Sequence, residues 1–587
     1  MKTIIDELTG LLAKAFEECG YDPALGQVIT ANRPDLCDYQ CDGALKGARK
    51  HRAAPMLVAG SVVRRLADNS FFAEISVAAP GFINLTLSDS KIIDRANEMA
   101  RRAQAGAPRA EKPETIIVDY GGPNIAKPLH IGHLRAAIIG ESIKRLMKLL
   151  GHKVIGDIHL GDWGLQIGLV IAELAERFPS QSCFGDGYRD GDQLPPLTAD
   201  DLNEIYPLAS QKSKEDQDFS GRAHQYTFDL QRGRPGVLAL WRRIWEISVG
   251  DLKKNYEKLN VDFDLWYGES DADKYVERVI SIFNEKGLLE NSGGARVVYV
   301  QQEDDRSPVP PVIIIKSDGA VNYETTDIAA LYQREKDFSP DRIWYVVDKR
   351  QALHFTQVFR ASKKADIAAG KTELLHLGFG TMNGLDGKPY KTRDGGIMRL
   401  SDMIETVTSA ALDKMKASDF VAADLREDVA RKIGVAAIKF GDLSNHRLKD
   451  YVFDLDRFLS FDGKTGTYLL YTVTRINSIL KKAGRGAPEA APGRLKGLYS
   501  PAERQLLLKI IGAADLFWLA AREKAPNFIC ESAYQIAAAF SLFYRDNHIL
   551  SENDPDKKES WLNLCALTQV WLKLHLDVLG IEAVDFM

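Results

Sequence analysis

The chain has 587 residues, of which 45% are hydrophobic and 27% are charged. This composition is ordinary for globular domains, and the length is too great for one core, so we expect roughly three or four domains. The net charge of −5 argues against a protein coated in nucleic acid, although 76 Lys and Arg residues suffice for a local basic groove. An early acidic pair, Asp6-Glu7, and the lack of any run of 18 apolar residues lead us to expect neither a secretory signal nor a membrane span.

Six cysteines are scattered along the chain, without a CxxC pair or a Cys/His cluster at zinc-ligand spacing. We therefore expect reduced, mostly buried thiols, no protein-bound zinc or other metal, and a cytoplasmic location.

Residues 1–112 are predicted to form a small α/β module. Helical periodicity between Ile5 and Phe16 opens it, and a strand-like run at 81–87 closes it. A Gly- and Pro-containing linker at 106–113 leads out of the module.

Residues 113–415 alternate short apolar runs with helical stretches, a pattern typical of βαβ units around a parallel sheet. A polar stretch at about 179–233 interrupts this alternation and is interpreted as an insertion or a surface excursion. The candidate strands are 116–118, 154–158, 312–315, 343–347 and 374–379.

Residues 416–587 are nearly all helical in pattern and predict a bundle, with an exposed loop at 484–492. The predicted fold class is therefore α/β: a Rossmann-like parallel-sheet domain lies between an N-terminal α/β module and a C-terminal all-helical bundle.

Two histidines lie in the string DYGGPNIAKPLHIGHLR at 119–135, where a strand enters a Gly/Pro loop and a helix begins near Gly132. Loops at the carboxyl ends of such strands bind ligands. His130 and His133 would lie at a helix N-terminus, where imidazoles can donate hydrogen bonds to phosphoryl oxygens as charge develops. Gly132 would let a flat base approach, and Lys127 would add a movable positive charge. The alternative is that the histidines merely cap the helix.

A second loop follows the strand at 374–380 and is rich in glycine, which favours flexibility. It carries Lys388 and Lys391. Taken alone, the loop is interpreted as a solvated basic turn.

The first motif resembles the HIGH signature of class I aminoacyl-tRNA synthetases, and its longer string resembles the arginyl enzymes, as does the stretch at 151–168. Lys388 and Lys391 align with the lysines of the family's KMSK motif, although Pro389-Tyr390 replaces its middle. The resemblance implies that this loop clamps the triphosphate and stabilises departing pyrophosphate. Cytidylyltransferases share HxGH but not this length. The resemblance covers nearly the whole chain. It implies a ligase that activates arginine with ATP and transfers it to tRNA(Arg), releasing AMP and pyrophosphate. We predict His130, His133, Lys127 and Lys391 as the catalytic residues that stabilise the charged transition state.

An arginine site needs carboxylates that form bidentate hydrogen bonds with the guanidinium group, and a tyrosine can stack on the plane of that group. Tyr323 and Asp327 are four residues apart and share one face if helical. The alternative for Tyr323 is an aromatic side chain of the core, and the alternative for Asp327 is an acid on the surface of a helix. The resemblance implies that both contact the guanidinium, together with Glu269. It also implies that the arginine site includes these residues at the amino and carboxylate ends of the substrate: Asn124, Gln351 and Asp119.

The resemblance further implies that residues 416–587 bind the anticodon and that the N-terminal module binds the tRNA elbow. Three tyrosines could stack splayed bases, Tyr468, Tyr471 and Tyr544, and the alternative for each is a buried aromatic in the core of the bundle. Of the three, Tyr468 is the predicted anticodon contact, and Gln40 and Asn84 are predicted base contacts. Mg²⁺ would enter with ATP, and we expect a monomer. Two alternatives remain at this point: a class I synthetase for another amino acid, and a non-enzymatic tRNA-binding paralogue.

Overall fold

The computed structural model describes residues 2–368, 370–388, 390, 398–415, 422, 424–485 and 492–587. The chain divides into two compact units. One combines Met1–Glu111, Met415–Phe440 and Asp456–Met587, and the other combines Lys112–Lys414 and Gly441–Leu455. Among the described helices, none is both long and apolar enough to cross a lipid bilayer.

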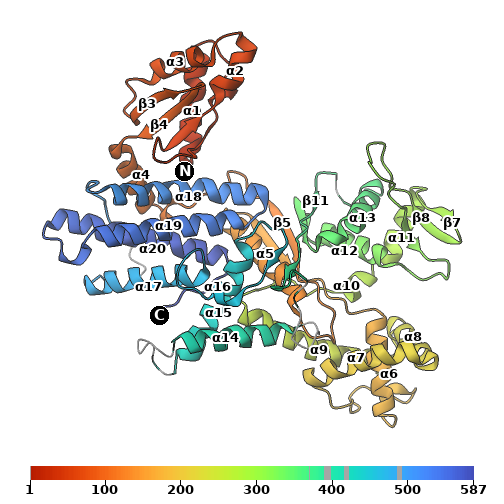
Figure 1. Cartoon of the computed structure of the whole chain (residues 1–587). Coiled ribbons are helices and arrows are strands. Elements are labelled where there is room, and N and C mark those ends of the chain that lie inside the picture. The colour runs from red at the N-terminus through yellow and green to blue at the C-terminus, as the bar shows by residue number, and fades with distance from the viewer. Residues whose placement is uncertain are drawn as a thin grey trace. The chain divides into compact units, whose positions relative to one another are not determined.

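The N-terminal module of the first unit is an antiparallel sheet with strand order β1-β2-β4-β3, against which three helices pack (Figure 1). Its first helix begins at a capping box made by Thr3 and Asp6, and it buries a stripe of Leu8, Leu12 and Phe16, as the periodicity predicts. The elements are α1 (Ile4–Glu18), β1 (Val28–Thr30), β2 (Tyr39–Cys41), α2 (Gly43–His51), α3 (Pro55–Leu66), β3 (Phe72–Ala78), β4 (Phe82–Leu87) and α4 (Asp89–Arg101).

The rest of this unit is helical, as predicted. It contains most of α15 (Arg426–Leu443), with α16 (Leu455–Phe458), α17 (Gly466–Lys482), α18 (Pro501–Glu523), α19 (Asn527–Asp546) and α20 (Pro555–Val578). Polar contacts tie it to the N-terminal module: Asn97 exchanges two hydrogen bonds with the Leu495 backbone, and Arg504 binds Asp38 through two nitrogens, at 3.0 and 2.7 Å. Most of the predicted loop at 484–492 lies outside the described residues.

The second unit is built on a parallel sheet in the order β11-β10-β5-β6, which confirms the predicted Rossmann-like arrangement. Ile117, Ile343 and Leu374 of this sheet pack into one core with Ile328 and Val358 of neighbouring helices. The elements are β5 (Thr115–Tyr120), α5 (Ile131–Leu149), β6 (Lys153–Asp157), α12 (Tyr323–Phe338), β10 (Arg342–Val346), α13 (Ala352–Lys364), β11 (Glu373–His376) and α14 (Leu400–Met415).

The predicted strand at 312–315 forms, but its expected place in the parallel sheet is wrong. It is β9 (Val312–Ile315), which pairs antiparallel with β8 (Ala295–Val298), and β8 pairs with β7 (Glu290–Ser292). Gly293 and Gly294 both have positive φ and close the β7–β8 hairpin, and β9 pairs with the other edge of β8, so these three strands form a separate sheet. Helices α10 (Glu269–Asp273) and α11 (Val276–Glu285) precede this hairpin.

The polar stretch at 179–233 contains a short 3-10 helix, η3 (Ser182–Phe184), and two α-helices, α7 (Ala199–Glu215) and α8 (Gln217–Gln231). Both pack on α6 (Leu165–Arg177), and α9 (Pro235–Lys258) follows. A small apolar core that includes Leu169, Phe219 and Ala223 holds this group together.

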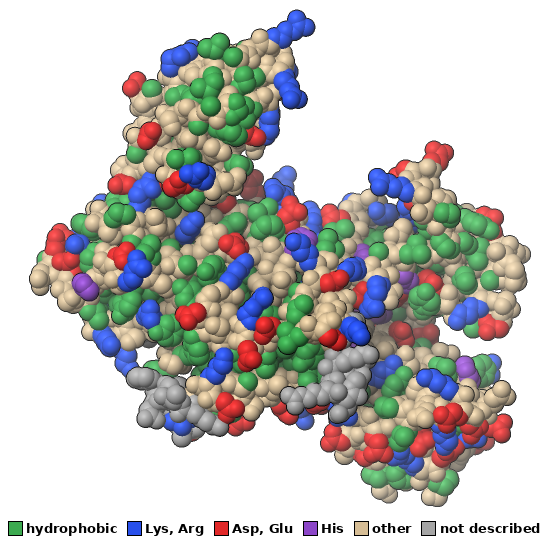
Figure 2. All heavy atoms as spheres, viewed as in Figure 1, with side chains coloured by type: hydrophobic (Ala, Val, Ile, Leu, Met, Phe, Trp, Pro, Cys, Tyr) green, Lys and Arg blue, Asp and Glu red, His purple; other side chains and the backbone are tan. Residues whose placement is uncertain are grey.

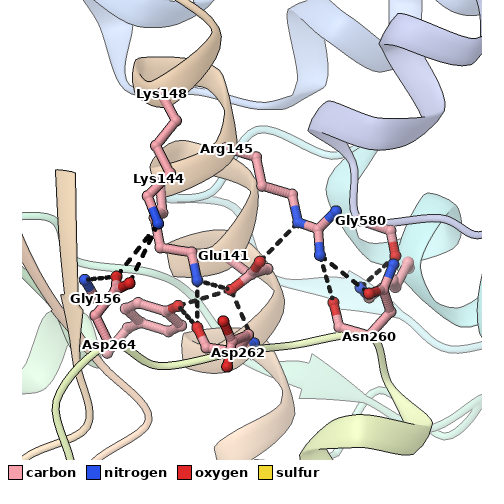
Figure 3. A network of polar contacts seen from close by, with 11 residues as sticks. Glu141, Lys144, Arg145, Lys148, Gly156, Asn260, Asp262, Asp264 and Gly580 are labelled. Carbon is pink, nitrogen blue, oxygen red and sulfur yellow. Dashed lines mark hydrogen bonds and ion pairs between the residues drawn. The ribbon is translucent and has the colours of Figure 1, made fainter. Parts of the chain in front are cut away.

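Helix α5 is fastened to the segment after α9 by a buried ionic network (Figure 3). The Glu141 carboxylate pairs with Lys144 at 2.9 Å and Arg145 at 2.6 Å on its own helix, and it accepts the Tyr120 hydroxyl of β5 at 2.7 Å. It also accepts the backbone N–H of Asp262, in the segment after α9, at 3.2 Å. Asp264 accepts the backbone N–H of Gly156 at 2.8 Å, which joins the same segment to β6. The helix that follows the two histidines is thereby bonded to β5 and to the segment after α9.

Residues 441–455 belong to the second unit, although the sequence pattern places them with the helical region 416–587. The reason is a two-residue strand, β13 (Tyr451–Val452), which pairs in parallel with β12 (Met382–Asn383). Strand β12 stands at the start of the loop that carries Lys388 and Lys391, here called the lysine loop.

Candidate active site

His130 and His133 share the cap of α5. Nδ1 of His130, the N-cap residue, accepts a hydrogen bond from the Gly132 N–H at 3.0 Å. The His130 backbone N–H donates to Nδ1 of His133 at 3.2 Å, and the two ring centres are 4.0 Å apart. The histidines do cap the helix, as the alternative interpretation holds, but capping occupies only Nδ1 of each ring.

Burial lowers the pKa of both imidazoles. The pKa of His130 falls through burial first and through the charge of Lys127 second. Burial, helped by His130 and Lys127, lowers the pKa of His133 to about 3. Both rings are therefore uncharged at neutral pH, and because each Nδ1 accepts a hydrogen bond, the proton lies on Nε2. Each Nε2–H is a neutral donor suited to a phosphoryl oxygen.

Gly132 makes room for the His130 ring. A Cβ at this position would lie 2.7 Å from Cε1 and 2.8 Å from Nδ1 of His130. Contact with a nucleotide base, the role that the sequence suggests for Gly132, stays a prediction.

Lys127 contacts the predicted insertion. Its Nζ lies 4.4 Å from the ring centre of Tyr206 on α7, a cation–π distance. The adjacent Ala126 N–H donates to the Ser248 hydroxyl of α9 at 3.0 Å. Helices at and just beyond the insertion thus hold the loop that precedes the histidines.

The chain beyond the lysine loop runs beside the histidine motif. His130 and Arg399 form an antiparallel bridge, and the Ile131 N–H donates to the Met398 carbonyl at 3.1 Å. Met398 and Arg399 are therefore bonded to the cap of α5.

Lys388 lies on the other arm of this loop, just after β12, and is exposed. The Gly384 N–H donates to the Lys388 carbonyl at 2.8 Å and closes a turn. Lys391 lies outside the described residues, and its catalytic role stays a prediction.

Three loop segments pair side by side beyond the parallel sheet. Asn124 forms a bridge with Gly161, and Leu160 forms one with Gly268. The Glu269 N–H donates to the Leu160 carbonyl at 3.0 Å. Asn124 and Glu269, which are predicted to hold opposite ends of the amino acid, thus flank one short segment.

Glu269 sits among further charged groups. Burial raises its pKa, the nearby His159 opposes this shift, and Asp162 and Asp327 add to it. Carboxylates that repel one another are stabilised when a cation lies between them. The electrostatics of this cluster therefore favour a positively charged substrate group.

Tyr323 and Asp327 occupy the first turns of α12 and contact the same ring, that of His354, so the prediction that they share a helix face is confirmed. Tyr323 is 59% exposed, which contradicts the alternative of a core aromatic.

Asp119 is buried at the end of β5. Its Oδ2 accepts a hydrogen bond at 2.5 Å from Arg334, which also binds Asp157 at 2.6 Å. Burial raises the pKa of Asp119, and Arg334 opposes that rise. Because Arg334 occupies Oδ2, a substrate amino group would be left with Oδ1.

Gln351 ends the short η4 helix (Lys349–Gln351) that follows β10, and it is exposed. It precedes His354 by three residues and is therefore close in sequence to the Tyr323–Asp327 group.

The sequence interpretation did not identify four residues of this region: His159, Asp162, Arg334 and His354. Asp162 alone carried a local signal, since it stands in the GDWG string at 161–164. It is fully buried, and its carboxylate accepts the Ser270 N–H at 2.9 Å and the Ser270 hydroxyl at 2.7 Å. Burial raises the pKa of Asp162 to about 6.

The predicted tRNA contacts lie in the other unit. The Tyr468 hydroxyl pairs with that of Ser541 on α19 at 2.7 Å, so this ring is engaged within the bundle. A groove of about 990 Å³ is lined instead by Tyr471, Arg475 and Tyr544, and the C-terminal residues Asp585, Phe586 and Met587 also face it. In the N-terminal module, Gln40 and Asn84 are register partners on β2 and β4, and their side chains are hydrogen bonded at 2.8 Å.

Comparisons with known proteins match three parts of the chain to described families. Residues 96–455 match the family described as tRNA synthetases class I (R), catalytic domain. Residues 469–587 match the DALR anticodon binding domain, and residues 3–87 match the arginyl tRNA synthetase N terminal domain.

The chain is 46% identical to an arginine–tRNA ligase of Alkaliphilus oremlandii and 45% identical to one of Agathobacter rectalis, over the full length of both partners in each case. It is also similar to the crystal structure of arginyl-tRNA synthetase from Plasmodium falciparum, with a TM-score of 0.82 and 26% identity, covering 100% of this chain and 99% of that one. The chain therefore belongs to the arginine–tRNA ligases, the arginyl-tRNA synthetases of class I.

Proposed function

We propose that this ligase activates arginine at the carboxyl edge of its parallel sheet, between the histidine cap of α5 and the acidic cluster around Asp327. The arginine carboxylate attacks the α-phosphorus of ATP, which forms the mixed anhydride and releases pyrophosphate. The terminal ribose hydroxyl of tRNA(Arg) then attacks the activated carbonyl and releases AMP. No covalent enzyme intermediate is required, so positioning and charge stabilisation supply the catalysis.

The observation that carries the choice of amino acid is the cluster of Glu269 and Asp327 beside an exposed tyrosine, Tyr323. A guanidinium is planar and presents paired N–H donors, which two carboxylates satisfy and which a phenol ring can cover. Lysine or citrulline would leave carboxylate oxygens without partners, a loss that costs orders of magnitude in rate. We assign Asn124, Gln351 and Oδ1 of Asp119 to the amino and carboxylate ends of arginine.

The histidines serve the phosphate end. Both Nδ1 atoms are occupied by the helix cap, so Nε2–H of His130 and His133 are the donors left for phosphoryl oxygens. Lys127, Lys388 and Lys391 are assigned to the β- and γ-phosphates. Mg²⁺ enters bound to ATP, as part of that substrate. We expect the enzyme to act as a monomer in the cytoplasm.

The first unit is assigned to tRNA. Arg475 lies over the rings of Tyr471 and Tyr544, at 4.5 and 5.2 Å, in the groove where splayed bases could stack. Figure 2 shows Lys and Arg side chains at the end of the N-terminal module where α2 and α3 lie, and these helices end in Arg49, Lys50, Arg64 and Arg65. We assign this basic end to tRNA phosphates, so tRNA binding should weaken as salt rises.

Charging of tRNA with radiolabelled arginine, together with pyrophosphate exchange for each amino acid, tests this function. We expect exchange with arginine only, measured with tRNA present. Exchange with another amino acid would support the alternative synthetase, and tRNA binding without exchange would support a non-enzymatic paralogue.

The substitution Asp327→Ala tests the arginine site. It should abolish charging while tRNA affinity stays within about twofold, since only substrate contacts are lost. The matched control is Asp337→Asn, an exposed acid farther along α12, which should leave charging unchanged. Full activity in Asp327→Ala would contradict the assignment.

A further inference from the structure

His354 connects two predicted guanidinium contacts. It lies on α13, and its Nε2 is 2.6 Å from Oδ2 of Asp327. Its ring centre lies 5.1 Å from that of Tyr323, with an interplanar angle of 32°. One imidazole therefore contacts both side chains, which lie one turn apart on α12.

The His354 side chain is less exposed to solvent than the Asp327 side chain with which it pairs. The His354 side chain is 13% exposed, whereas that of Asp327 is 33% exposed. The histidine thus lies beneath the carboxylate, on the side away from solvent. Because a carboxylate can only accept, the hydrogen bond requires the proton on Nε2 of His354.

The other ring nitrogen of His354, Nδ1, destabilises the folded state because it is buried without a hydrogen-bond partner among the described residues. The neighbouring ring of Phe355, 5.2 Å from that of His354 between centres, is apolar. A residue selected for packing alone would be apolar here, since an unpaired buried nitrogen destabilises the folded state. The polar atom that justifies a histidine is Nε2, which faces Asp327.

We propose that His354 is a positioning residue for arginine recognition, an inference that rests on the proposed role of Asp327 and Tyr323. The Nε2–H holds Oδ2 of Asp327, which fixes the plane of the carboxylate and leaves Oδ1 and the second lone pair of Oδ2 for the guanidinium. The ring also limits the rotation of Tyr323. The site is then formed before arginine arrives, and less entropy is lost on binding.

Two substitutions separate the hydrogen bond from the packing. His354→Phe keeps a flat ring against Tyr323 but removes the donor, and His354→Gln keeps a side-chain N–H but removes the ring. Pyrophosphate exchange with tRNA gives KM for arginine, KM for ATP and kcat, and thermal unfolding gives the stability. Thr356→Ala on the same helix is the control, because the Thr356 hydroxyl bonds only to its own helix at Ala352 among the described contacts.

We expect His354→Phe to raise KM for arginine about tenfold, the scale of one charged hydrogen bond, with KM for ATP within about twofold. Its thermal midpoint should be equal to or above that of the native chain, because the orphan Nδ1 is gone. His354→Gln should recover most of the arginine affinity. A structural role predicts the reverse, a fall in stability with all kinetic constants affected together, and that result would overturn the inference.

Asp327→Asn distinguishes a failure of the proposed arginine site from a failure of the positioning role of His354. If it leaves KM for arginine unchanged, the proposed arginine site is wrong. If it raises KM for arginine while His354→Phe does not, only the role of His354 is wrong. In the double variant, the His354→Phe effect should disappear, because its target carboxylate is already lost.

Discussion

Arg135, two residues after the second histidine, forms a buried ion pair with Asp442, with Nε 2.9 Å from Oδ2. Both side chains are almost completely removed from solvent, at 3% and 0% exposure. The same guanidinium donates to the Gly380 carbonyl at 2.6 Å and to the Lys449 carbonyl at 3.2 Å. Arg135 therefore joins the histidine helix, the root of the lysine loop and the segment 441–455 within one unit.

Replacing Arg135 with Met should destabilise the chain by about 3–5 kcal/mol, because Asp442 would remain buried without its cation. Burial already raises the pKa of Asp442, and Arg135 opposes that rise. Urea-induced unfolding measures the loss. The double variant Arg135→Met/Asp442→Asn should be more stable than the single one, and equal stability of the two would contradict this account.

Gly132→Ala should lower kcat for arginine activation by about ten- to a hundredfold, because the new methyl group displaces the His130 ring from its cap. KM for arginine should change little, since the acidic cluster is untouched. Pyrophosphate exchange measures both constants. Gly250→Ala on α9 is the matched control, because a Cβ there meets nothing within 4 Å. An unchanged kcat in Gly132→Ala would mean that the His130 ring position does not matter.

Acid should destabilise the folded chain partly through His133. Its pKa falls from 6.5 to about 3 on folding, so below pH 6.5 the unfolded chain binds a proton that the folded chain refuses. This contribution is complete above pH 6.5 and is lost at about 1.4 kcal/mol per pH unit as the pH falls towards 3.

The variant His133→Asn keeps a cap acceptor but does not titrate. Its thermal midpoint should therefore fall less steeply than that of the native chain between pH 7 and pH 5. His575, whose pKa burial lowers to about 4, contributes equally to both chains and cancels in the comparison. Parallel pH profiles would show that His133 titrates normally.

Local patterns predicted the elements well because their signals are local. The glycine at 151 and the apolar stripe before it locate α5, and the apolar runs locate the four strands of the parallel sheet. The placement of β9 failed because this strand pairs with β8 in a separate three-stranded sheet, and the pattern of a single strand does not show which strand it pairs with. Arg334 and His354 went unnoticed for a different reason. Arg334 meets Asp119 across 215 positions of sequence, and no local spacing encodes such a contact.

Stacking in the groove of the helical unit should contribute to tRNA affinity through Tyr544. This ring is 39% exposed, and Arg475 lies 5.2 Å from its centre. Tyr544→Ala should raise KM for tRNA by about tenfold, the scale of one base–aromatic stack, with KM for arginine unchanged.

Tyr468→Phe separates the two candidate anticodon contacts, because it removes only the hydroxyl that pairs with Ser541. It should cost about 1 kcal/mol of stability and leave KM for tRNA unchanged. A rise in KM for tRNA with Tyr468→Phe, and none with Tyr544→Ala, would instead assign anticodon recognition to Tyr468.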